Sequence, residues 1–336
     1  MQKISRMSRR SFVCAGLASA TVLGASPSAF ASAGKPEKTS LKLGLPVDAA
    51  SFTPAYVGVD AGMWKAAGLD VQMTVFRGDA EVSQALAGGS IDISLQSLDG
   101  LISLLNAHQP VRGFYAGFYQ ADFAWCSQPK ITSWKDLKGS SIGISSFGSL
   151  TEALSSYALR QHGLEPMKDV NLVQVGPTSA AFQALKSGRL GAAILSPPFK
   201  WTAQDEGFHL LGTMASEVSP EWPKHIFIAP TKYLDDNRNT VEALLRGFVN
   251  SIRYARSHKS ETVAIIGKRL KYDAANAAKA YDEMMPNYNE RGTLPDKKYM
   301  DIFWKLEMAN GQVKEPWPNS KLLDDRFIKS FAQWVS

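Results

Sequence analysis

A repeat with an offset of 99 residues constrains the fold of this chain more than any other feature. The first copy contains Gln84-Ala85-Leu86, Gly89 and Ser97, and the second contains Gln183-Ala184-Leu185, Gly188 and Ser196. At the same offset Gly44 corresponds to Gly143. The chain therefore holds two copies of one folding unit, and we predict two lobes.

Each copy is predicted to alternate strands with helices. The strands are expected at 41–45, 71–76 and 91–95, then at 141–145, 170–175 and 190–195. The helices are expected at 54–67 and 82–87, then at 150–162 and 180–186, most of them followed by a glycine that accepts a left-handed cap. This alternation is typical of parallel βαβ units with right-handed crossovers. We predict an α/β fold of two βαβ-built domains, with a hinge and a central ligand cleft where the strand ends of both lobes meet.

The predicted lobes do not follow one another simply along the chain. Residues 39–125 and 224–336 are expected to form lobe one, and residues 126–223 lobe two. After the second copy the sequence continues as a strand near 224–229 and a helix-rich tail, which we expect to return to lobe one. Two strands, near 114–125 and 224–229, would then cross between the lobes as a hinge.

The first 33 residues are predicted to be an export signal. Arg9 and Arg10 form a twin-arginine pattern, and an uncharged stretch rich in Ala and Gly follows. The Ala-x-Ala sites ending at Ala31 and Ala33 predict cleavage and a periplasmic location. A membrane anchor is the alternative, but the apolar stretch is shorter than the roughly 18 residues that a membrane-spanning helix needs. Cys14 lacks the preceding apolar run that a lipoprotein would have.

Charge and cysteine content narrow the class of protein. Four of the 37 basic residues lie in the signal, so the remaining 33 nearly balance 31 acidic residues and form no basic stripe. Nucleic-acid binding therefore has no electrostatic basis. Removing the signal leaves Cys126 alone, which excludes an intrachain disulfide, and its apolar surroundings favour core packing over a reactive role.

Several runs in the mature chain carry a family resemblance. Pro54-Ala55-Tyr56-Val57-Gly58, followed by Gly62-Met63-Trp64, resembles the opening of periplasmic solute-binding proteins of ABC importers, in the nitrate, sulfonate, taurine and thiamine-precursor group. The run from Trp134 to Gly139 resembles the same proteins. The resemblance covers nearly the whole mature chain. It implies a type II periplasmic-binding fold, a small organic ligand, and permease and ATPase subunits as partners. We expect a monomer without cofactor or metal.

The binding residues are expected in turns where a strand gives way to a helix. Helix N-termini expose unpaired N–H groups that favour anions, hydroxyl groups add donors, and glycine allows close backbone approach. In lobe one the candidates are Ser51, Phe52, Thr53, Arg77, Gly78, Asp79, Gln96 and Ser97. In lobe two they are Ser146, Phe147, Gly148, Ser149, Thr178, Ser196 and Pro197.

Each candidate also has a purely structural interpretation. Ser, Thr and Asp are the favoured N-cap residues of any helix. Arg77 can bind a carboxylate or sulfonate in bidentate fashion, or stand solvated at the edge of a loop. Phe52 and Phe147 can line an apolar slot or pack at the rim between the lobes. Asp48, Asp79 and Asp99 would oppose a highly charged anion, so an organic anion such as a sulfonate or an aromatic carboxylate is expected rather than nitrate.

The sequence gives little support to an enzymatic function. The five histidines contain no His-x-x-x-His pair, and neither Gly-x-Ser-x-Gly nor Gly-x-x-x-x-Gly-Lys occurs. The enzyme class that remains is the fungal-type pyrimidine synthase of thiamine biosynthesis, which resembles these proteins but uses histidine and several cysteines. A periplasmic ligand-sensing protein is a third possibility. We therefore predict a non-enzymatic binding protein.

Overall fold

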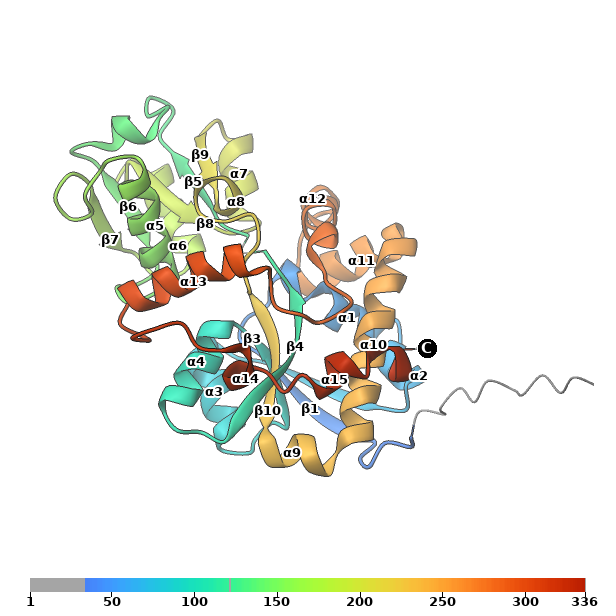
Figure 1. Cartoon of the computed structure of the whole chain (residues 1–336). Helices are drawn as coiled ribbons and strands as arrows, with labels where there is room; N and C mark the ends of the chain where they lie inside the picture. Colours follow the sequence, from blue (N-terminus) through green and yellow to red (C-terminus); the bar gives the residue numbers. More distant parts are fainter. Residues whose placement is uncertain (1–33, 121, 336) are drawn as a thin grey trace, which may run out of the picture. The chain divides into compact units, whose positions relative to one another are not determined.

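The computed structural model describes residues 34–120 and 122–335 (Figure 1). The predicted export signal, with both cleavage sites, lies outside the described residues. Within the described part, no helix is long and apolar enough to cross a membrane.

The first sheet has the strand order β2-β1-β3-β10-β4. It consists of β1 (Ser40–Leu45), β2 (Asp70–Val75), β3 (Ile93–Gln96), β10 (His225–Pro230) and β4 (Val111–Phe118). β1 pairs in parallel with β2 and β3, whereas β10 is antiparallel to both β3 and β4. Strand β10 thus joins this sheet from a distant part of the sequence.

The second sheet has the equivalent order, β7-β6-β8-β5-β9. It consists of β5 (Ala124–Ser127), β6 (Ser141–Ile144), β7 (Asn171–Gln174), β8 (Ala192–Leu195) and β9 (His209–Thr213). Here β5 is the antiparallel strand, paired with β8 and β9. The prediction of parallel sheets is therefore right for the repeated strands and wrong for the sheets as a whole, because β10 and β5 come from outside the repeat and run the other way.

The 99-residue offset holds in the strand register. Leu43 pairs with Ile93 between β1 and β3, and Ile142 pairs with Ala192 between β6 and β8, which is 99 residues further at both positions. A Cβ on Gly44 would stand 2.4 Å from Ile91 Cδ1, and a Cβ on Gly143 would stand 2.5 Å from the equivalent Leu190 Cδ1. The two glycines lie in separate sheets and are required for the same reason. Ile91, just before β3, and Leu190, just before β8, fill the space that a Cβ would need.

Helices follow most strands of the first copy. They are α1 (Thr53–Asp60), α2 (Met63–Ala66), α3 (Asp79–Ala87) and α4 (Leu98–Asn106), with the short 3-10 helix η1 (Ala50–Phe52) before α1. The single helix predicted at 54–67 is wrong. It is broken at Gly62, whose φ of +76° ends α1 and caps α2.

The second copy carries a similar series, namely α5 (Leu150–Gln161), α6 (Thr178–Lys186), α7 (Phe199–Asp205) and α8 (Met214–Glu217). The short helix η2 (Trp134–Leu137) precedes β6. Cys126 in β5 is fully buried, as predicted, and burial raises the pKa of its thiol to about 12.

The strand predicted at 114–125 is two strands. β4 ends at Phe118 in the first sheet, and β5 begins at Ala124 in the second. The returning segment, which leads from α8 to β10, runs beside this link, since Lys224 N donates to Phe118 O at 3.2 Å. Two adjacent segments therefore connect the sheets.

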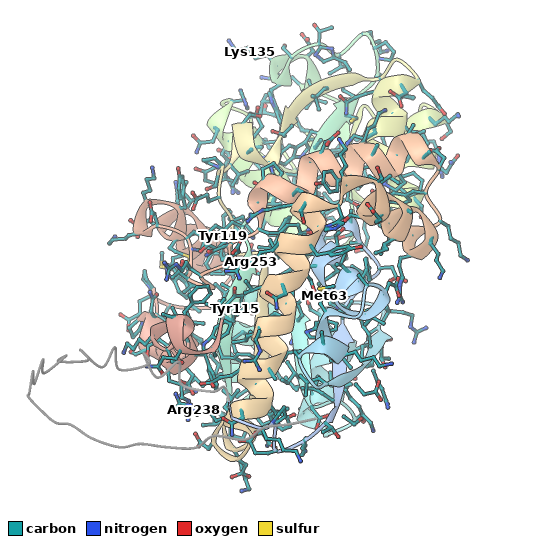
Figure 2. All side chains as sticks on the ribbon, turned by 90° about the vertical axis from the view of Figure 1, so that its right-hand side faces the viewer. Met63, Tyr115, Tyr119, Lys135, Arg238 and Arg253 are labelled. Carbon is teal, nitrogen blue, oxygen red and sulfur yellow. The ribbon has the colours of Figure 1, made fainter. Side chains whose placement is uncertain are left out.

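The tail beyond β10 is helical. It contains α9 (Thr231–Asp236), α10 (Arg238–Ser257), α11 (Lys259–Leu270), α12 (Ala274–Met284), η3 (Met285–Asn287), α13 (Lys297–Ala309), α14 (Asn319–Leu322), α15 (Arg326–Lys329) and α16 (Phe331–Trp334). Figure 2 shows α10 lengthwise, with Arg238 near one end and Arg253 toward the other.

Most of this tail packs against elements of the first sheet. The indole N–H of Trp64 in α2 donates to Leu244 O of α10 at 2.9 Å. A Cβ on Gly247 would stand 2.2 Å from Trp64 Cδ1, so glycine permits this close helix contact. Helix α13 differs, because it packs against α5 of the second copy, where Lys305 Nζ lies 5.3 Å from the ring centroid of Tyr157. The tail thus contacts both copies.

Candidate ligand-binding site

A hydrogen bond between side chains joins the turn after β3, which contains Ser97, to the start of α3 at Asp79. Ser97 is the N-cap of α4, where its hydroxyl accepts from Gly100 N at 3.0 Å. The same hydroxyl donates to Asp79 Oδ2 at 2.9 Å, at the start of α3. Burial raises the pKa of Asp79, although hydrogen bonds from Ser97 oppose the rise. The structure therefore brings Asp79 and Ser97 together at the carboxyl edge of the first sheet.

The second copy repeats this link with different chemistry. Ser196 N donates to Thr178 Oγ1 at 3.0 Å, and these residues lie 99 positions after Ser97 and Asp79. A hydroxyl thus replaces a carboxylate at the equivalent position. The chain continues through the cis peptide bond between Pro197 and Pro198 into α7.

The hydroxyl-rich loop from Ser145 to Thr151 bonds largely to itself. Ser145 Oγ donates to Ser149 Oγ at 3.0 Å, and Thr151 Oγ1 accepts from Ser145 N at 2.9 Å. Ser149 caps α5 and also donates to Ser146 O at 2.6 Å. In the same loop Gly148 has a φ of +76°, and Phe147 is 50% exposed. These hydroxyl groups therefore stabilise the loop itself, which is the structural alternative to ligand binding.

Arg77 and Gln96 are also engaged within the chain. The Arg77 side chain is 89% exposed, and its Nη2 lies 2.8 Å from Glu81 Oε1 one helical turn away. Its neighbour Gly78 precedes α3 with a φ of +125°. Gln96 is buried, donating to Ser94 Oγ at 3.0 Å and accepting from Ser83 Oγ at 3.1 Å. Arg77 therefore lies at the surface, whereas Gln96 fixes the end of β3.

Ser51, Phe52 and Thr53 are all buried at the carboxyl end of β1. Phe52 stacks on His225 at the start of β10, with ring centroids 4.0 Å apart. Thr53 Oγ1 donates to Ala50 O at 2.6 Å. Among the described residues, neither Ser51 Oγ nor His225 Nδ1 has a hydrogen-bond partner. Burial lowers the pKa of His225 well below its usual value, so this ring is neutral.

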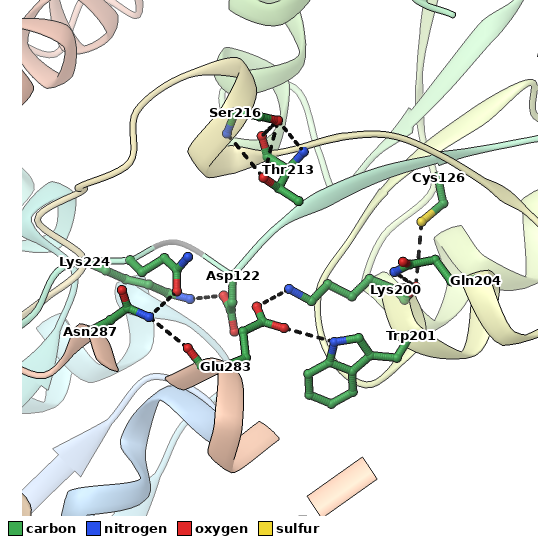
Figure 3. A network of polar contacts seen from close by, with 11 residues as sticks. Asp122, Cys126, Lys200, Trp201, Gln204, Thr213, Ser216, Lys224, Glu283 and Asn287 are labelled. Carbon is green, nitrogen blue, oxygen red and sulfur yellow. Dashed lines mark hydrogen bonds and ion pairs between the residues drawn. The ribbon is translucent and has the colours of Figure 1, made fainter. Parts of the chain in front are cut away.

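A charged cluster that the sequence did not predict lies where the two copies meet (Figure 3). Asp122, in the link between β4 and β5, forms an ion pair with Lys224, in the returning segment. Burial opposes ionisation of Asp122, but the charges of Lys224 and Lys200 hold its pKa below the usual value. The Asp122 carboxylate is therefore charged although its side chain is only 4% exposed.

A second ion pair joins α7 to α12. Lys200 Nζ pairs with Glu283 Oε1, and the indole N–H of Trp201 donates to Glu283 Oε2 at 2.9 Å (Figure 3). The Lys200 side chain is only 6% exposed. Further along the same helices, Lys279 Nζ lies 2.7 Å from Asp205 Oδ2. Helix α12 also packs against η1, so these contacts connect the second copy to elements of the first sheet.

A cavity of about 280 Å³ adjoins this ion pair. It is lined by Gln120, Phe123, Ala124, Lys200, Trp201, Gln204, Leu210, Thr213, Met214, Ala215 and Glu283. Its walls combine apolar side chains with one cation and one carboxylate, which is the composition expected of a small-molecule site. None of the fifteen predicted site residues lines it, although Pro197 lies three positions before Lys200.

A larger groove of about 670 Å³ lies elsewhere, lined by residues that include Ser40, Trp64 and Asp70. Ser40 and Asp70 are the first residues of β1 and β2, so this groove borders the amino ends of the parallel strands. Open α/β sheets bind ligands at the carboxyl ends of their strands. Ala124 pairs with Leu195, the last residue of β8, and with Thr213 of β9. Both Ala124 and Thr213 line the smaller cavity, which therefore borders the carboxyl end of β8, and we take this cavity as the candidate site.

The described residues contain no group of three or more His, Cys, Asp and Glu that could hold a metal ion. The histidines take part in other contacts instead. His162 pairs with Glu217 at 2.7 Å and stacks on Trp134, and His258 stacks on Tyr254. The thiol of Cys126 donates to Lys200 O at 3.8 Å.

Comparison with known proteins identifies the family. A family model described as NMT1/THI5 like matches residues 49–262. The chain belongs to this family. The chain is also 26% identical to "Putative binding protein YtlA" of Bacillus subtilis over 218 residues, a match that spans 63% of this chain and 65% of YtlA.

Solved structures show that this NMT1/THI5-like chain has the two-lobed α/β fold of periplasmic binding proteins. The aliphatic sulphonate-binding protein SsuA of Escherichia coli superposes with a TM-score of 0.71 and 18% identity, covering 85% of this chain and 92% of SsuA. The nitrate-binding protein NrtA of Synechocystis superposes with a TM-score of 0.71 and 15% identity, covering 89% and 90%. The predicted fold class and family group are confirmed.

Proposed function

We propose that this protein is the periplasmic substrate-binding component of an ABC importer and that it captures a small organic anion between two lobes. The observation that carries the proposal is the cavity of about 280 Å³ at the junction of the copies, whose lining combines apolar side chains with the buried Lys200, paired there with Glu283. Membership of the NMT1/THI5-like family and the names of YtlA, SsuA and NrtA support it. Permease and ATPase subunits would then be its partners.

The two lobes in this proposal follow the strands. Lobe one contains the first sheet and most of the tail, and lobe two contains the second sheet. The boundaries we propose fall at 119–123, between β4 and β5, and at 218–224, before β10. Two short adjacent segments of this kind suit a hinge, because few dihedral angles need to change when lobes close on a ligand. Export through the twin-arginine signal, with cleavage near Ala31 or Ala33, belongs to the same proposal.

We propose a binding function without catalysis. Cys126 is buried with a raised pKa, so it is a poor nucleophile. His225 is buried between aromatic rings, stacked on Phe52 and on Phe118. Neither group is placed to activate a substrate in the candidate cavity. A monomer is the corresponding assembly, since each chain would hold a complete site.

A thermal-shift panel tests this proposal. Aliphatic sulfonates, aromatic carboxylates and their neutral amides would be titrated against the mature protein, and each compound would be analysed afterwards by mass spectrometry. A ligand that binds the folded state raises the melting temperature with its concentration. We expect at least one anion to do so while remaining chemically intact. The absence of any shift, or the conversion of a compound to product, would contradict the proposal.

A further inference from the structure

The contact between α7 and α12 has the chemistry of an occupied anion site. Lys200 and Trp201 are consecutive in α7 and present an ammonium group and an indole N–H to the same carboxylate, that of Glu283. Each oxygen of Glu283 meets a different donor. Such charge-assisted pairs are the strong hydrogen bonds of proteins. An exogenous carboxylate or sulfonate would meet the same two donors.

The burial of Lys200 means that this site requires an anion. The ammonium group has little contact with water, and an unpaired buried charge is strongly unfavourable. Glu283 is the less committed partner, since its side chain is 25% exposed and it reaches α7 from another helix. An anion that takes the place of Glu283 would keep Lys200 paired and free Glu283 toward solvent. Lys279 lies one turn earlier on α12 and is the nearest cation of that helix.

The adjoining cavity defines what else the anion carries. Phe123, Leu210 and Met214 provide apolar wall, and Lys200 and Glu283 lie on the same lining. A molecule with one anionic group and a small apolar body would place the body against these side chains and the charge against Lys200. The nearby Asp122 and Lys224 already neutralise one another, so they add no second anion-binding charge.

We propose that Lys200 and Trp201 form the anion subsite of the ligand cavity and that Glu283 occupies this subsite as a competitor built into the chain. This inference rests on the binding function proposed above and identifies the part of the cavity that recognises charge. The ligand class is a small amphiphilic mono-anion. Glu283 sets the affinity, because a ligand must displace it to reach Lys200.

Calorimetric titration of matched variants tests the proposal. The probes are benzoate, 1-butanesulfonate and benzamide, the last being a neutral counterpart of benzoate. In Glu283→Gln the competing charge is gone, and we expect affinity for the anions to rise about tenfold while affinity for benzamide stays the same. In the double variant K200M/E283Q the preference for benzoate over benzamide should disappear. A melting curve of each variant establishes that it is folded.

The control is Asp205→Asn, which removes the neighbouring ion pair between the same two helices but leaves the subsite intact. If D205N tightens anion binding as much as E283Q does, the gain comes from loosening α7 against α12, and the subsite proposal is wrong. If the protein binds a probe but E283Q leaves its anion affinity unchanged, the subsite proposal fails and the binding function stands. If no probe binds any folded variant, the proposed function fails for this ligand class, and the subsite proposal fails with it.

Discussion

The buried carboxyl group of Glu307 predicts that the protein loses stability as the pH rises. Glu307 lies in α13 and interacts with Asp99 in the first turn of α4. Burial, the charge of Asp99 and hydrogen bonding to Asp99 together raise the pKa of Glu307 to about 9. Burial raises the pKa of Asp99 as well. The folded state therefore keeps a proton on this pair that the unfolded chain releases.

The size of the effect follows from the difference in pKa. Glu307 has a pKa of about 9 in the folded protein against an ordinary value of 4.5. Each pH unit between these values costs about 1.4 kcal/mol of unfolding free energy, because folding must take up a proton. The stabilising effect of this group is complete below pH 4.5 and is lost as the pH rises toward 9. Between pH 5.5 and 7.5 the loss is on the order of 3 kcal/mol.

Urea unfolding of wild type and Glu307→Gln at pH 5.5, 6.5 and 7.5 measures this loss. Glutamine has nearly the same shape and no proton to release, so the variant should gain stability relative to wild type by on the order of 1 kcal/mol per pH unit. Glu315→Gln, which changes an exposed glutamate, is the matched control and should follow wild type. A difference between E307Q and wild type that does not depend on pH would refute the reasoning.

Three further pairs of variants probe the fold at particular positions, each by urea unfolding. Gly44→Ala should lower the free energy of unfolding by about 1–3 kcal/mol through overpacking. The loss should exceed that of Gly143→Ala, because the new Cβ at Gly44 meets two side-chain atoms within 2.7 Å rather than one, and equal losses would contradict this ranking. Lys224→Met should lower the free energy of unfolding by about 3–5 kcal/mol, because it leaves Asp122 without its ion-pair partner. The double variant K224M/D122N should recover much of this loss, and no recovery would mean that the ion pair is not the cause. Ser97→Ala should lower the free energy of unfolding by about 1–2 kcal/mol, because it removes the hydroxyl that caps α4. Ser196→Ala, at the equivalent repeat position, should lower it by less than about 0.5 kcal/mol, since Ser196 bonds to Thr178 through its backbone N–H. The reverse order would contradict these roles.

The repeat made much of the architecture predictable. Because the two copies share their spacing, every strand predicted in them is present within two residues of its expected bounds. Gly44 and Gly143 lie at equivalent register positions in separate sheets, as the offset implies. The direction of β5 and β10 was not predictable in this way, since neither strand belongs to the repeat and their pairing depends on the path of the chain between the sheets.

The candidate site was less accessible to sequence reasoning for a physical reason. Ser97 and Ser149 were candidates for ligand binding with helix capping as the alternative, and they do cap α4 and α5, since capping acts between neighbouring residues. Lys200 and Glu283 are 83 residues apart on different helices, and their contact depends on how those helices pack. The sequence pointed to Lys200 only through its position, since Lys200 follows the turn after β8 that contains the predicted site residues Ser196 and Pro197.

The most direct test of the central claim is a distance measurement between the lobes. Spin labels on cysteines introduced at the exposed positions Lys135, in η2, and Arg238, at the start of α10, would report the separation by pulsed electron paramagnetic resonance. Cys126 is fully buried and would not take up label. On saturation with an anion that binds in calorimetry, we predict a shift to one narrower distance distribution. An unchanged distribution at saturation would contradict a ligand held between two closing lobes.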